Sequence, residues 1–189
     1  MFAAIFVALA VVASPTAEPS SEVVRAQVEA AADALRGAIV GGDVDAVARS
    51  IASDGVVCGE DVEDRELVHR RLRSKAGTLH AQLFDTAEYR KLLERWGEDG
   101  SAALSFREFF TRAKQVVVDV SWAARSSGRR GWVTWGTPAG DPASWPIVQF
   151  VIDGDGVVSF RAFGTCALRE MKRAGAAEPP RPRPRSQGL

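Results

Sequence analysis

The sequence predicts an α+β fold, in which helices pack on one face of a curved, mainly antiparallel sheet. Two observations support this prediction: three- and four-residue apolar spacing dominates the first part of the chain, and period-two alternation dominates the later part. The strongest local signal is residues 145–164, WPIVQFVIDGDGVVSFRAFG. Two alternating runs flank an Asp-Gly turn there, which is typical of a β-hairpin. Helices that precede a run of strands favour an α+β domain over a parallel α/β sheet.

Composition limits the functions to be considered. The chain has 189 residues, enough for one domain with terminal extras, and 24 basic residues balance 24 acidic ones. Nucleic-acid binding is not expected, because it needs a basic face that this balance does not indicate. No phosphate-binding loop, zinc-protease motif or dinucleotide fingerprint occurs. The sequence therefore predicts no cofactor, no metal site and no catalytic motif.

The amino terminus predicts export. Residues 2–13 form an uninterrupted apolar run, too short to cross a bilayer comfortably but typical of a signal peptide. The alternative is a buried amino-terminal helix. We predict a signal peptide over residues 1–13, a linker over 14–19 and no membrane span after signal removal. The mature protein is then periplasmic or secreted.

The first half of the remaining chain is predicted to be mainly helical. A helix is expected from about residue 20 to Val40, followed by a short helix capped by Asp43 and a short strand at 56–58. An acidic run then offers two interpretations, a divalent-cation site or a cap at Asp64 for the next helix, of which the cap is favoured. The run comprises Glu60, Asp61, Glu63 and Asp64.

The acidic run is followed by a helix at 65–75 and a predicted strand at 78–84, where Leu79, Ala81 and Leu83 alternate with polar residues. Asp85 and Ser105 are predicted to cap two further helices. Four strands complete the domain, whose predicted bounds are 20–168. Residues 169–189 contain alternating Arg-Pro pairs and are predicted to form a disordered tail.

Two stretches resemble a known superfamily. The segment GGDVDAVARSIASDGVV and the closing pair QFVIDGDGVVSFRAF are similar to the nuclear transport factor 2-like superfamily, which includes SnoaL-like and ketosteroid isomerase-like proteins. The resemblance implies a cone-like sheet around a pocket, with residues 86–113 as an inserted helical pair. Isomerase-like members use a Tyr and carboxylic acids inside the cone. The only Tyr here is Tyr89, inside the insertion, so no catalytic residue is carried over.

Four residues are candidates for lining such a pocket: His80, Asp119, Trp122 and Trp135. His80 is placed in the middle of a strand and could act as an acid or base, or be an ordinary satisfied histidine. Asp119 interrupts an apolar strand, and could point into the cone or face water. Strand-spaced tryptophans are more often core than pocket floor. The other histidine, His69, is expected to be exposed.

Two classes of function remain open from the sequence. The first is a non-enzymatic exported module that binds a small apolar ligand or a protein partner. The second is a small enzyme that performs acid–base chemistry on an apolar molecule, with Asp119 or His80 as the base. The absence of a recognisable acid–base set favours the first class.

The two cysteines, Cys58 and Cys166, are predicted to form a disulfide. They are the only cysteines in the chain, and export would place them where disulfides persist. In a cone-like fold the first short strand and the end of the last strand lie near each other. The alternative is a pair of buried free thiols.

Overall fold

The structure, a computed structural model, describes residues 21–58, 61–125, 128–140, 145–153 and 156–175. The predicted signal peptide, the linker and the Arg-Pro segment after residue 175 lie outside this range. The elements in chain order are α1 (Ser21–Gly41), α2 (Val44–Arg49), β1 (Val56–Cys58), β2 (Asp61–Glu63), α3 (Arg65–Arg73), α4 (Thr78–Phe84), α5 (Thr86–Arg95), α6 (Phe106–Arg112), β3 (Val117–Arg125), β4 (Gly128–Gly136), β5 (Ile147–Ile152), β6 (Val158–Phe163) and α7 (Gly164–Ala174). This order confirms the predicted α+β class.

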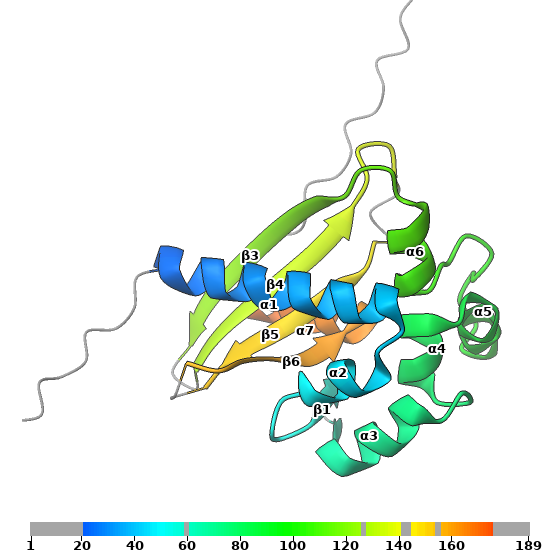
Figure 1. The fold of residues 1–189 in the computed structure, drawn as a ribbon, viewed down its shortest axis with the longest axis horizontal. Coiled ribbons are helices and arrows are strands. Elements are labelled where there is room, and N and C mark those ends of the chain that lie inside the picture. The colour runs from blue at the N-terminus through cyan, green and yellow to red at the C-terminus, as the bar shows by residue number, and fades with distance from the viewer. Residues whose placement is uncertain (1–20, 59–60, 126–127, 141–144, 154–155, 176–189) are drawn as a thin grey trace, which may run out of the picture.

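The main sheet is an antiparallel meander in the order β3-β4-β5-β6. Figure 1 shows α1 crossing one face of this sheet and α7 lying behind the other, while α3, α4, α5 and α6 gather beyond one end of α1. A second, two-stranded sheet pairs β1 with β2. Residues 50–52 attach to the free edge of β6, where the Ala52 amide donates to the Phe160 carbonyl at 2.9 Å. This attachment carries β1 towards the start of α7.

Strand alternation divides the core between the two faces of the sheet. Val133 and Trp135 of β4 belong to the cluster shared with α1 and α6, whereas Trp132 faces α7 and packs with Ala167 and Met171. Phe110 meets Trp135 edge-to-face with ring centroids 5.5 Å apart. The space between α1 and the sheet is thus occupied by packed side chains. The cone shape remains a prediction.

Four predicted helix caps are confirmed. The side chains of Asp43, Asp64, Asp85 and Ser105 accept hydrogen bonds from backbone amides in the first turns of α2, α3, α5 and α6. Asp64 accepts from the amides of Glu66 and Leu67 at 2.9 and 3.2 Å. The acidic run therefore contributes a helix cap, as expected.

The predicted strand over 78–84 is wrong, because these residues form α4. The helix packs against α3, α5 and α6, and Leu79, Ala81, Gln82 and Leu83 are all buried. Burial on several sides removes the one-sided apolar stripe that normally identifies a helix. His80 is consequently a helical residue.

Two further elements differ from the sequence-based expectation. Strand β2, at Asp61–Glu63, was not predicted, since its pairing with β1 leaves Asp61 and Val62 exposed and gives no apolar alternation. The domain also continues beyond residue 168, because α7 runs to Ala174 and buries Ala167 and Met171. The predicted tail boundary is thus too early.

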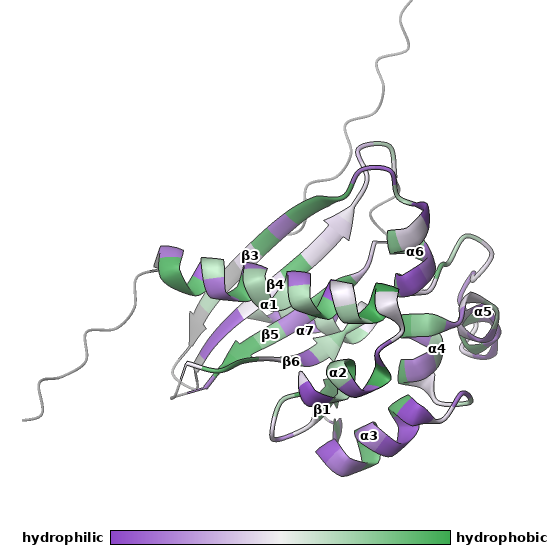
Figure 2. Ribbon diagram, viewed as in Figure 1, coloured by the Kyte–Doolittle hydropathy of each residue, from purple (hydrophilic) through white to green (hydrophobic). Residues whose placement is uncertain are grey.

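Figure 2 shows hydrophilic residues dominating α3 and alternating with hydrophobic ones along α1.

Candidate functional site

A partly enclosed cavity of about 230 Å³ lies where the small sheet, helices α3 to α5 and the β6–α7 junction meet. Its wall is mainly apolar, with contributions from Val56, Leu79, Leu93 and Phe163. The first three are at most 6% exposed, so much of the wall belongs to the folded interior. The cavity is therefore bounded by well-packed elements.

Two polar side chains meet in this apolar wall. The Gln82 amide nitrogen donates to the Tyr89 hydroxyl at 3.3 Å, and Gln82 is only 7% exposed. Burial raises the pKa of Tyr89, and the negative charge of Glu98 raises it further, while the bond from Gln82 opposes this shift. The Tyr89 hydroxyl therefore remains protonated through the neutral range and can donate a hydrogen bond.

The amino-terminal end of α7 forms another part of the wall. Phe163, Thr165 and Cys166 line the cavity, and no side chain caps this eleven-residue helix. Amide N–H groups in the first turn of a helix have no partner within the helix and carry a partial positive charge. The cavity therefore adjoins a helix end whose first-turn amides are hydrogen-bond donors.

Gly164 permits the close approach of Gln82 to this helix end. Its φ is +58°, and a Cβ there would lie 2.0 Å from the Gln82 amide nitrogen. Any larger residue would be strained by the backbone conformation and would also displace the Gln82 side chain. The glycine thus sets the position of one of the two polar groups in the wall.

The predicted disulfide is confirmed and forms part of the cavity wall. Cys58, at the end of β1, is bonded to Cys166 in the first turn of α7, with the two Cα atoms 4.9 Å apart. Both cysteines line the cavity. The bond therefore holds the small sheet against the helix end that supplies the amide donors.

The cavity has a partly exposed rim. Arg71 and Glu63 line it and form an ion pair whose side chains are 49% and 40% exposed. Trp96 also contributes to the lining and is 53% exposed. The charged lining residues are thus paired with each other and partly exposed to solvent, whereas Gln82 is buried.

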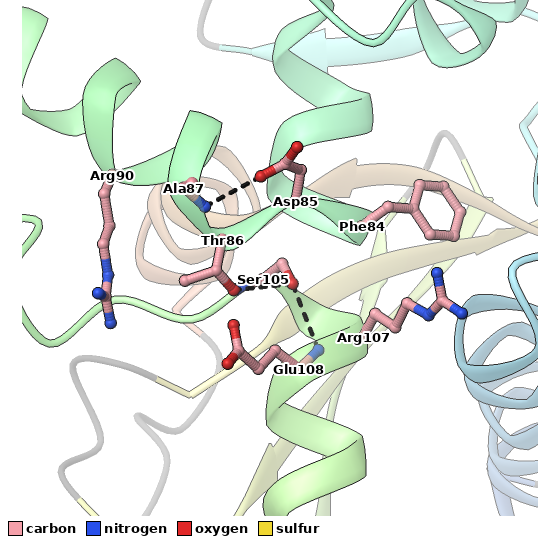
Figure 3. A pocket seen from close by; sticks show the side chains of 8 residues that line it. All are labelled: Phe84, Asp85, Thr86, Ala87, Arg90, Ser105, Arg107 and Glu108. Atoms are coloured by element: carbon pink, nitrogen blue, oxygen red, sulfur yellow. Dashed lines mark hydrogen bonds between the residues drawn. The ribbon is translucent and has the colours of Figure 1, made fainter.

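A second hollow, shown in Figure 3, is more open and lies where α5 and α6 begin. Several of its polar side chains are engaged in hydrogen bonds that stabilise the fold. Asp85 accepts from the Ala87 amide at 3.0 Å, Ser105 accepts from the Glu108 amide at 3.3 Å, and Thr86 contacts Ser105 through hydroxyls 3.1 Å apart. These bonds explain the side chains as caps and a helix–helix link.

Of the four predicted pocket residues, His80, Asp119 and Trp135 do not line this cavity. The His80 Nδ1 lies 2.7 Å from the Leu72 carbonyl oxygen, and its ring packs on Phe84. Trp135 is 1% exposed and belongs to the core. His80 is thus a histidine whose ring is hydrogen-bonded within the helical part of the fold, and Trp135 is a core residue. Both outcomes are the alternatives to pocket lining that the sequence left open.

The other two candidates lie on β3. Asp119 is paired with Thr134, on the face of the sheet opposite Val133 and α1, and is half-buried. It therefore does not point into the space between α1 and the sheet. The side chain of Trp122 lies outside the described part of the structure.

The prediction that His69 is exposed is also wrong. It is half-buried, and its Nε2 lies 2.7 Å from the Ala48 carbonyl oxygen. This contact joins α3 to α2, because His69 belongs to α3 and Ala48 to α2. The neighbouring residue Val68 is also buried.

Sequence reasoning missed Gln82 and Tyr89 as site residues. The strand assignment for 78–84 separated them, whereas the break between α4 and α5 at Asp85 brings their side chains together. The single Tyr of the chain, placed in an otherwise apolar stripe, was the available signal.

Across the residues that the structure describes, no three His, Cys, Asp or Glu side chains are grouped as a metal site would require. Within the same residues no helix is both long and apolar enough to traverse a bilayer. No protein-family model, curated protein or solved structure matches the chain. The fold and site define an α+β domain with a partly enclosed, mainly apolar cavity, and the nuclear transport factor 2-like resemblance stays a prediction.

Proposed function

We propose that this protein is an exported binding module that holds a small, mainly apolar molecule in this cavity. The observation that supports this proposal is a partly enclosed cavity of about 230 Å³ with a mainly apolar wall and a polar pair, the buried Gln82 and the half-buried Tyr89. Apolar cavities of about 150 Å³ bind benzene when they stay dry. The expected ligand is therefore a small aromatic or alicyclic compound.

The export part of the proposal has separate support. An apolar run at residues 2–13 has the length of a signal-peptide core, and the disulfide belongs to proteins of oxidising compartments. Membership of the nuclear transport factor 2-like superfamily is supported by the helix-first order and the closing hairpin.

Binding is favoured over acid–base catalysis because the two candidate bases do not converge. His80 is bonded to a backbone carbonyl on α3, and Asp119 lies on the sheet face away from α1. A base must reach its proton within hydrogen-bond distance. Neither side chain belongs to the wall of the partly enclosed cavity.

A pair of matched substitutions tests the proposed site. Val56 lines the cavity and is 6% exposed, whereas Val62, on the opposite face of the small sheet, is 56% exposed and does not line it. Val56→Phe should fill the cavity and weaken binding of a small aromatic hydrocarbon, such as cumene, by about tenfold or more. Val62→Phe should leave that affinity unchanged.

Calorimetry or ligand-detected NMR measures these affinities, and circular dichroism checks that both variants fold. Binding that is equally strong in Val56→Phe and the unmodified protein would place the ligand elsewhere. Absence of binding by the unmodified protein to any small apolar probe would reject the proposed function.

A further inference from the structure

The polar part of the cavity wall indicates which kind of ligand the cavity selects. This step rests on the proposed function and concerns the chemistry of the ligand. Three groups meet at one place: the Tyr89 hydroxyl, the Gln82 amide and the uncapped first turn of α7. The short distance from Gln82 to the position of a Gly164 Cβ places the amide against the helix end.

These groups offer mainly hydrogen-bond donors. With Gln82 donating to Tyr89, the Tyr89 hydrogen has no acceptor among the described residues. If the amide were turned over, Tyr89 would donate to its oxygen, and the Gln82 amide hydrogens would be left without a partner. Either arrangement leaves a donor, and the first-turn amides of α7 add others. A ligand that fills the cavity therefore satisfies the wall best with an acceptor.

The charges around the cavity favour an uncharged acceptor. The charged residues that line it are Arg71 and Glu63, which pair with each other at the rim. A carboxylate at the buried end would lose its hydration without a free cation to replace it, and such burial is costly. A carbonyl oxygen needs only the donors that are present.

We propose that the cavity selects a small, uncharged aromatic or alicyclic compound carrying a carbonyl oxygen, which is held by Tyr89 and the amide groups at the start of α7. The apolar body of the ligand lies against Val56, Leu79 and Leu93. Its carbonyl oxygen accepts from the Tyr89 hydroxyl and from the first turn at Thr165 and Cys166. The disulfide fixes this turn relative to the small sheet.

Three probes of nearly the same shape separate the possibilities: acetophenone, its hydrocarbon analogue cumene and the anion benzoate. Acetophenone should bind about tenfold more tightly than cumene, because each unpaired buried donor is unfavourable. It should also shift the amide NMR signals of Thr165 and Cys166, which cumene should leave nearly unchanged. Benzoate should bind more weakly than acetophenone.

Tyr89→Phe removes the hydroxyl and keeps the shape of the ring. It should abolish most of the preference for acetophenone over cumene while cumene still binds. Thr111→Val, which removes a hydroxyl bonded to the Arg107 carbonyl on the exposed side of α6, is the matched control and should preserve the preference.

Equal affinities for acetophenone and cumene would overturn this inference and leave the proposed binding function intact. Tightest binding of benzoate would also overturn it, because the site would then select an anion. Failure of all three probes to bind would reject the proposed function together with the inference. A preference for acetophenone that survives in Tyr89→Phe without shifts at α7 would assign the carbonyl to another place.

Discussion

Replacing both cysteines with serine should remove a large share of the folding stability. The Cys58–Cys166 bond closes a loop with a sequence separation of 108 residues. The chain-entropy relation assigns about 4.7 kcal/mol to a loop of this length, through the freedom that the crosslink takes from the unfolded chain. Small domains have a total stability of about 5–15 kcal/mol. The variant should therefore remain marginally folded, with a melting temperature lower by about 10–20 °C.

Urea unfolding followed by tryptophan fluorescence measures this effect. The slope of the unfolding free energy against urea should increase in the variant, because an uncrosslinked unfolded chain exposes more surface. Reductant should destabilise the unmodified protein by a similar amount and leave the variant unaffected. A loss below about 1 kcal/mol with an unchanged slope would refute the loop-entropy argument.

Three other measurements test individual features. Gly164→Ala should destabilise the fold by about 3 kcal/mol, because φ is +58° and the new Cβ would lie 2.0 Å from a buried amide. Gly175→Ala, where φ is +69° and the space is open, should lower the unfolding free energy by only about 1 kcal/mol in the same denaturation assay. Asp64→Ala should lose about 1 kcal/mol with its cap, whereas removal of the exposed Asp61 carboxylate should change stability by less than about 0.5 kcal/mol; similar losses in both would contradict the cap. Because burial raises the pKa of Tyr89 in the folded state, that state retains the proton longer than the unfolded chain, so unfolding free energy should fall as the pH rises above about 10. The chain has one Tyr, so alkaline absorbance titration reads this group directly, and an unshifted midpoint would contradict its burial.

Local chemistry made most helix boundaries predictable. Asp64, Asp85 and Ser105 each precede a helix whose first-turn amides need an acceptor, and the structure shows those bonds. The alternation in residues 145–164 likewise predicted β5 and β6. Such signals depend on neighbours in the chain, so they can be read from a sequence.

Features that depend on distant neighbours were not predictable in the same way. Apolar and polar residues alternate along α4, which is typical of a strand. The helix tolerates this pattern because other helices cover several of its sides, including the side that bears Gln82. Helix α7 has charged residues around a narrow buried stripe of Ala167 and Met171, and it follows the strand that the sequence does reveal. Because the sequence did not predict α4 and α7 as helices, it gave no indication of the cavity that both of them line.

The cavity itself has no sequence signature. Tyr89 and Gln82 meet across the turn at Asp85, and the helix end opposite them comes from the other end of the domain. The two cysteines were the one sequence feature that linked these regions. Their pairing could be predicted because the chain offers no other partner for either.

The position of the disulfide also determines how the domain would respond to a mechanical pull on its two ends. A force applied at α1 and at the end of α7 reaches Cys58 and Cys166 and then passes through the covalent bond, bypassing the chain between them. That chain contains the whole main sheet and helices α3 to α6. Its contour length, about 380 Å for a separation of 108 residues, would be released only after reduction. Stretching single molecules with and without reductant would therefore reveal two extension lengths that differ by roughly this amount.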